Sequence, residues 1–283
     1  MPTQKPPRPA QPPLELRRTS RIVATSPGCE PLRAAYAAAV VKKPKAWEDV
    51  EDLFLRGMEG LDANIASGVA KMGDLQNGKG DFFNDLIALL LENCADVQLW
   101  SRRSVPGLII PTNNLDVTYP NSDPIEFVLE AKAVGTPRHP GSPKQKAIGR
   151  QGSADLAKRI KEVGFKTIDL KAEYARNMTS SGTSPAAMSG DFVTWLHSVK
   201  PRSYLFVAAR VTTDRDREQV FRYARRARFV SDDVGVFCFR PVSEASPTTY
   251  RAERVDDDLE LSRALFRACR ALTSIREARE PTR

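Results

Sequence analysis

The sequence predicts an α/β protein with a mixed central β-sheet flanked by helices and preceded by a helical segment. Apolar residues recur at helical spacing through the first third of the chain, and short segments rich in β-branched and aromatic residues follow. Helical patterns separate the later strands, which is typical of this fold class. A chain of 283 residues with 41% hydrophobic content can form a substantial core. We therefore expect a single domain over residues 31–283, with helices in 31–95, an α/β core in 96–240 and a C-terminal helix in 241–283.

Residues 1–30 are expected to lie outside this domain as a disordered, Pro-rich, basic arm. Seven of the 21 prolines fall within residues 1–28, where Glu15 is the only acidic residue. Proline lacks the N–H donor that helices and sheets need, so an extended conformation is favoured. The arm is basic enough to contact phosphates, and a tail without contacts is the alternative interpretation.

The expected elements follow from the spacing of apolar residues. Helical patterns cover residues 31–72 and 81–93, with a turn signal at residues 77–80 between them. The predicted strands are residues 97–100, 114–119, 125–134, 165–174, 204–211 and 234–239. The predicted later helices are residues 154–163, 215–229 and 259–278, and the predicted long loops are residues 136–152 and 177–190.

Charge and composition narrow the class of protein. The chain carries 43 Lys and Arg against 35 Asp and Glu, a net charge of +8, which favours a polyanionic partner such as nucleic acid. No apolar run approaches the ~20 residues of a membrane span, and the N-terminus lacks an apolar signal segment. We therefore expect a soluble intracellular protein.

Cysteines and histidines limit the metal chemistry. The four cysteines are far apart and lack C-x-x-C spacing, so the sequence predicts reduced thiols rather than a zinc site or a disulfide framework. Only two histidines are present. A metal would be held mainly by carboxylates, which favours a hard ion such as Mg²⁺.

One predicted strand carries two charged residues among apolar ones. Glu130 and Lys132 lie two apart in residues 127–134, so their side chains point to one face. Ionised groups seldom enter such a strand without a partner or a function. Asp116 lies fourteen residues before Glu130, and a turn at residues 120–124 would bring the two together in an antiparallel pair. Asp116 and Glu130 could then hold Mg²⁺, while Lys132 orients the attacking water and stabilises the charge that develops on phosphorus.

This arrangement, Asp116 followed by Glu130-Ala131-Lys132, resembles the PD-(D/E)xK nuclease signature. The helix around residues 80–86 is similar to the helix that leads into the core in many members, and the size and basic charge are most similar to a type II restriction endonuclease. The resemblance implies Mg²⁺ as cofactor with Mn²⁺ as a possible substitute, double-stranded DNA as substrate, and a cytoplasmic protein of a prokaryote. Because cutting both strands of a symmetric site requires a two-fold assembly, we also expect a homodimer. It implies that Asp116, Glu130 and Lys132 are catalytic, and that Asp116, Glu130 and Ala131 hold the metal.

Four further residues are expected near this centre. Asn84 and Asp85 lie on the leading helix, and Asn84 stands where several relatives carry a metal-orienting Glu. Lys171 and Glu173 lie in the predicted strand 165–174, where they either border the cleft or form a solvated face.

A second acidic-x-Lys tripeptide, Asp169-Leu170-Lys171, is an alternative catalytic pair. It also has an acidic residue fourteen positions upstream, Asp155. We rank it below the first because Asp155 lies on a predicted helix, where it cannot pair with Asp169 across a hairpin.

Basic and amide side chains around the proposed catalytic strand are candidates for DNA contacts, since such groups track phosphates and read base edges. The candidates are Lys79, Arg138, Lys144, Gln145, Lys146 and Arg150. Two other functions stay open: a structure-specific repair or junction nuclease, and a non-catalytic DNA-binding protein of the same fold.

Overall fold

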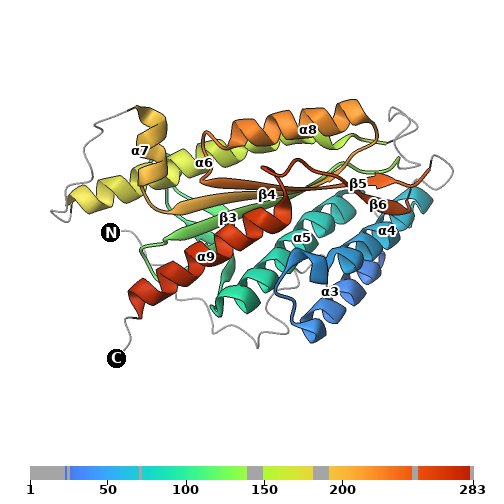
Figure 1. The fold of residues 1–283 in the computed structure, drawn as a ribbon, viewed down its shortest axis with the longest axis horizontal. Helices are drawn as coiled ribbons and strands as arrows, with labels where there is room; N and C mark the ends of the chain where they lie inside the picture. The colour runs from blue at the N-terminus through green and yellow to red at the C-terminus, as the bar shows by residue number, and fades with distance from the viewer. Residues whose placement is uncertain are drawn as a thin grey trace.

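One six-stranded mixed sheet with helices on both faces makes up the fold (Figure 1). A computed structural model describes residues 23, 26–69, 72–138, 149–180, 191–243 and 248–280. The helices in these residues are α3 (Glu30–Lys42), α4 (Glu51–Ser67), α5 (Met72–Ala95), α6 (Gly152–Ser180), α7 (Phe192–Ser198), α8 (Asp214–Ala227) and α9 (Leu261–Arg279), with the 3-10 turns η1 (Pro27–Cys29) and η2 (Trp47–Asp49). The strands are β1 (Trp100–Val105), β2 (Asn113–Tyr119), β3 (Phe127–Val134), β4 (Arg202–Arg210), β5 (Asp233–Pro241) and β6 (Tyr250–Glu253).

The strand order is β1-β2-β3-β4-β5-β6. The first three strands form an antiparallel meander, β3, β4 and β5 are parallel, and β6 returns antiparallel to β5. Helix α6 connects β3 to β4 and α8 connects β4 to β5, as parallel neighbours require a crossover. The predicted class, α/β with a mixed sheet flanked by helices, is confirmed.

Helices cover both faces of the sheet. Figure 1 shows α6 and α8 on one face, and α9, α5, α4 and α3 on the other. Alternate residues of β4 enter the two resulting cores, so the strand reads as a continuous apolar run. Among the described residues, no helix has both the length and the apolar composition that crossing a bilayer requires.

The predicted strand at residues 165–174 is wrong, because these residues form the second half of α6. Leu156, Val163 and Leu170 are all buried and recur every seven residues, which is two helical turns. The short apolar and β-branched run around Thr167 resembles a strand only when it is separated from the longer pattern. The helix continues to Ser180, so the predicted loop at 177–190 begins too early, and residues 181–190 lie outside the described part.

Other boundaries also differ from the prediction. The turn expected at residues 77–80 lies inside α5, and the strand expected at residues 97–100 begins only at Trp100. The short elements α7 and β6 were not predicted, so the segment after residue 240 contains a strand before its helix.

Part of the expected arm is folded. Residues 27–29 form η1, and Val23 is buried, with its carbonyl accepting a hydrogen bond from Arg33 Nη1 at 2.8 Å. The remainder of residues 1–25 lies outside the described part of the chain.

Two of the four cysteines form a disulfide, so the expectation of four reduced thiols is wrong. Cys94 of α5 and Cys269 of α9 are 175 residues apart in sequence, and the packing of these two helices brings their Cα atoms to 6.2 Å. Cys29 and Cys238 are free and buried, as expected.

Candidate active site

The candidate site lies where β2 and β3 part. The ladder between these strands runs from Tyr119–Phe127 to Val117–Leu129 and stops there, while β2 continues to pair with β1 as far as Asn113. Asp116 and Glu130 are the first residues beyond the last pair. The fork therefore opens a gap in the sheet at the position of the two carboxylates.

Lys132 joins the two carboxylates. Its Nζ lies 2.5 Å from Asp116 Oδ2 and 2.7 Å from Glu130 Oε2. The Ala131 N–H also donates to Asp116 Oδ2, at 3.0 Å. The exposed fraction of the side chain rises from 4% for Glu130 to 17% for Lys132 and 28% for Asp116. The predicted group of Asp116, Glu130 and Lys132 is thus brought together, and it opens to solvent on the Asp116 side.

A second lysine reaches the same carboxylate from α6. Lys166 Nζ lies 3.2 Å from both oxygens of Glu130 and 2.7 Å from the carbonyl oxygen of Asn114. Lys166 was not among the predicted site residues, because residues 165–174 were interpreted as a strand. The seven-residue period of α6 is the signal that would have placed Lys166 on a helix facing β3.

Burial and charge set the protonation of the site. Burial raises the pKa of the Glu130 carboxyl, and the neighbouring Asp116 carboxylate adds to this rise, which Lys132 and Lys166 oppose. Burial alone would lower the pKa of Lys132, but the Asp116 and Glu130 carboxylates outweigh it and raise that pKa above its ordinary value. Lys132 is therefore an ammonium ion at neutral pH.

Two residues of helix α5 contact Asp116 or its neighbour Arg102. The Asn84 side-chain amide donates to the Asp116 carbonyl oxygen at 3.4 Å, and the buried Asp85 accepts a hydrogen bond from Arg102 Nη2 at 2.7 Å. Arg102 lies on β1 between the residues that pair with Val117 and Leu115, and it has a left-handed φ of 55°, a conformation that non-glycine residues seldom adopt. Asn84 and Asp85 therefore lie beside the site as expected, and Arg102 is an addition that the sequence did not reveal.

The alternative tripeptide does not form a second site. Successive helical residues are rotated by ~100°, so Asp169 and Lys171 point in different directions from α6. Asp169 accepts hydrogen bonds from the β1–β2 connection, whereas Lys171 is fully buried and pairs with Asp232 at 2.9 Å. The expectation that Lys171 borders the cleft is wrong. Glu173 accepts a hydrogen bond from Arg176 at 2.5 Å and lines a separate cavity.

The candidate DNA-contacting residues lie in different environments. Lys79 is 2% exposed, and its Nζ donates to the Gly135 carbonyl oxygen inside the protein, so the expected phosphate contact at this residue is wrong. Arg138 is exposed, and the half-exposed Arg150 pairs with Asp155. Lys144, Gln145 and Lys146 lie outside the described residues.

Two carboxylates suit a Mg²⁺ ion, which completes its coordination with water, better than a metal ion that takes all of its ligands from side chains. Within the described ranges, no group of three or more His, Cys, Asp or Glu side chains could hold a metal ion. Mg²⁺ is usually bound by one or two carboxylates and keeps several waters. Asp116 and Glu130 already converge on one cation, the Lys132 ammonium, so these two residues fit such an ion.

Ala131 can add a third oxygen to this pair. The N–H and C=O of one residue in an extended strand point to the same side of that strand. The Ala131 N–H faces Asp116, so the Ala131 carbonyl faces the same gap between β2 and β3. The place of Ala131 among the metal ligands stays a prediction.

Comparison of the chain with protein-family models, with curated proteins and with solved structures finds no match. The geometry of the site is therefore the basis of the functional argument.

Proposed function

We propose that this protein is a Mg²⁺-dependent endonuclease of the type II restriction class, which hydrolyses phosphodiester bonds in double-stranded DNA. The observation that carries the proposal is the convergence of Asp116 and Glu130 on one cation at the fork of β2 and β3. An antiparallel pair that carries the Asp on one strand and the Glu-x-Lys on the next is also the arrangement that the PD-(D/E)xK resemblance implies.

Each residue of the site would have a separate role in the reaction. Asp116, Glu130 and the Ala131 carbonyl would hold Mg²⁺, which supplies the charge that polarises a phosphoryl group and acidifies a bound water. Lys132 stays protonated because its pKa is raised, so it would act as a hydrogen-bond donor that orients the attacking water and balances charge at phosphorus. Lys166 brings a further positive charge to the same side of the sheet, where a phosphate would lie.

A specific observation also favours a second candidate, a non-catalytic DNA-binding protein of the same fold. In the structure, Lys132 pairs with both carboxylates, and such an ion-paired group is what a protein without nuclease activity would retain. The net charge of +8 fits a DNA partner under either proposal.

Digestion of a mixed-sequence supercoiled plasmid separates the candidates. The restriction-type proposal predicts discrete linear fragments in Mg²⁺ or Mn²⁺ and none with a chelator. Nicking confined to branched or distorted DNA would identify a structure-specific nuclease. Salt-sensitive DNA binding without cleavage in either metal would refute the nuclease proposal and favour the binding protein.

A further inference from the structure

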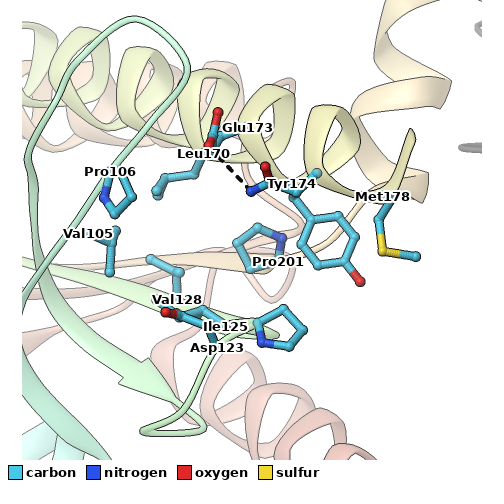
Figure 2. A pocket seen from close by; sticks show the side chains of 12 residues that line it. Val105, Pro106, Asp123, Ile125, Val128, Leu170, Glu173, Tyr174, Met178 and Pro201 are labelled. Atoms are coloured by element: carbon cyan, nitrogen blue, oxygen red, sulfur yellow. Dashed lines mark hydrogen bonds between the residues drawn. The ribbon is translucent and has the colours of Figure 1, made fainter. Parts of the chain in front are cut away.

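The side chains of β2 change face at Asp116. Leu115 belongs to a small core that includes Leu170 of α6, whereas Val117 belongs to the large core on the α5 side of the sheet. Figure 2 shows Leu170 of α6 and Val128 of β3, both members of the small core, lining a common cavity. In a regular strand two residues that lie two apart point to the same face. Strand β2 is therefore sharply twisted between Leu115 and Val117, and Asp116 lies at the twist.

The neighbouring strand has an unusual backbone conformation at the same point. Arg102 lies on β1 between Ser101 and Arg103, the residues that pair with the two neighbours of Asp116 in β2. Within the strands that the structure describes, Arg102 is the only non-glycine residue with a positive φ, which is 55°. This left-handed conformation brings Cβ too close to the backbone, so a residue with a side chain needs other contacts to keep it.

Two carboxylates of α5 supply such contacts. The Arg102 Nη2 atom lies 2.7 Å from Asp85 Oδ1 and 3.6 Å from Asp81 Oδ1, and Asp85 is buried. Burial alone would lower the pKa of the Arg102 guanidinium, but the carboxylates of Asp85, Asp81 and Asp116 outweigh it and raise that pKa. Breaking the pair would leave the buried Asp85 carboxylate without its cation, which is costly. The ion pairs with α5 can therefore hold Arg102 in a conformation that its backbone disfavours.

The twist directs the Asp116 carboxylate along the sheet, toward β3. Its Oδ2 atom accepts a hydrogen bond from the Ala131 N–H at 3.0 Å and lies 2.5 Å from Lys132 Nζ. Side chains of a regular strand stand roughly perpendicular to the sheet, so they do not reach a backbone N–H of the next strand. The position of this carboxylate in the candidate site therefore depends on the distortion of β2 opposite Arg102.

We propose that Arg102 is a positioning residue for the candidate metal site: its left-handed conformation, held by Asp85 and Asp81, twists β2 and directs the Asp116 carboxylate toward β3. The inference rests on the proposed function in one respect, because the carboxylate that Arg102 positions is a proposed Mg²⁺ ligand. As a positive charge near Asp116, Arg102 would by itself oppose the binding of a cation. A positioning role and a purely electrostatic role therefore predict opposite effects on metal affinity when the arginine is removed.

Hydrogen exchange of the Ala131 amide, measured by NMR on the full chain, tests the positioning without a metal. Asp116 protects this N–H, so in Arg102→Ala it should exchange at least ~10-fold faster relative to the Leu129 N–H, which lies in the intact part of the β2–β3 ladder. Arg102→Gly should lose less protection, because glycine adopts a positive φ without strain. Lys43→Ala makes a comparable change at another left-handed residue, after α3, and should leave the ratio unchanged.

Binding of Mn²⁺, followed by the EPR signal of the free ion, tests the consequence for the site. Mn²⁺ affinity should fall at least ~10-fold in Arg102→Ala and at least ~3-fold in Arg102→Gly, and should be unchanged in Lys43→Ala. If Arg102 acts only as a charge, both of its variants will bind Mn²⁺ more tightly than the wild type. Because glycine suits this backbone, Arg102→Gly gives the sign of the effect even if the alanine variant does not fold. Glu130→Gln should weaken Mn²⁺ binding and thereby show that the titration measures this site.

Either of two results would overturn the inference. One is exchange of Ala131 relative to Leu129 that is the same in Arg102→Ala as in the wild type, and the other is Mn²⁺ affinity that is unchanged or higher in both Arg102 variants. A wild type that binds no Mn²⁺ would instead refute the metal site of the proposed function. The exchange of Ala131 would still decide whether Arg102 positions Asp116.

Discussion

The buried Lys79 should make the stability of the protein rise with pH, and Lys79→Met should remove this dependence. Burial, with a contribution from Arg210 and against the pull of Asp62, lowers the pKa of Lys79 from 10.5 to about 8. Between these two values the unfolded chain binds the proton and the native protein does not, so the free energy of unfolding increases with pH.

The size of this pH dependence follows from the shift in the pKa of Lys79. Each pKa unit corresponds to ~1.4 kcal/mol, so the full range contributes roughly 3 kcal/mol, of which about 1.4 kcal/mol falls between pH 7 and pH 9. Burial raises the pKa of Cys238, which opposes the rise in this range, but it does so equally in the wild type and in the variant. The difference between the two proteins therefore isolates Lys79.

Urea unfolding at pH 7 and pH 9 measures this difference. We expect the stability of the wild type relative to Lys79→Met to increase by about 1.4 kcal/mol between the two pH values. Lys158→Met, which removes an exposed lysine, serves as the matched control and should give no such increase. A wild-type advantage that is the same at both pH values would refute the assignment of a depressed pKa to Lys79.

Three further predictions concern the site and its surroundings. Protons compete with Mg²⁺ for Glu130, whose pKa is raised above 4.5, so calorimetric Mg²⁺ affinity should fall on acidification from pH 7.5 to pH 4.5, and equal affinities would contradict the role of Glu130. Asp169→Ala leaves the buried Asn113 side-chain amide and the partly buried Ile109 N–H without their acceptor and should lower the free energy of unfolding by about 2 kcal/mol or more, whereas a change under ~0.5 kcal/mol would argue against this role of Asp169. Lys166→Met should weaken duplex binding and reduce the slope of log affinity against log salt by about one, and an unchanged slope would show that Lys166 does not face a phosphate.

The centre of the candidate site could be predicted because it depends on local geometry. Asp116 and Glu130 lie on consecutive strands joined by a short turn, so their antiparallel pairing follows from the strand pattern and the spacing. Lys132 follows from the two-residue repeat of β3. None of these placements requires knowledge of how distant segments pack.

The remaining site residues depend on packing between distant segments. Lys166 reaches Glu130 only because α6 crosses back over β3, and the strand predicted at residues 165–174 concealed this helix. The same error made Asp169 and Lys171 look like a second catalytic pair. On α6, Asp169 accepts hydrogen bonds from the segment between β1 and β2, whereas Lys171 is buried and pairs with Asp232.

The fold was predictable in class but not in its long-range contacts. Lys79 lies between Gly78 and Gly80, which favour a turn, yet α5 continues through them because its apolar face is buried against the sheet. Cys94 and Cys269 are 175 residues apart, and only the packing of α5 against α9 brings them together.

The most direct test of the proposed function compares the rate of duplex cleavage by Glu130→Gln and Lys132→Met with that of the wild type at saturating Mg²⁺. Glu218→Gln and Lys158→Met make the same chemical changes at exposed positions on α8 and α6 and serve as matched controls. We predict that each site variant binds duplex DNA but cleaves it at least ~100-fold more slowly, while both controls cleave at the wild-type rate. Cleavage by Glu130→Gln or Lys132→Met at the wild-type rate would contradict the assignment of this site.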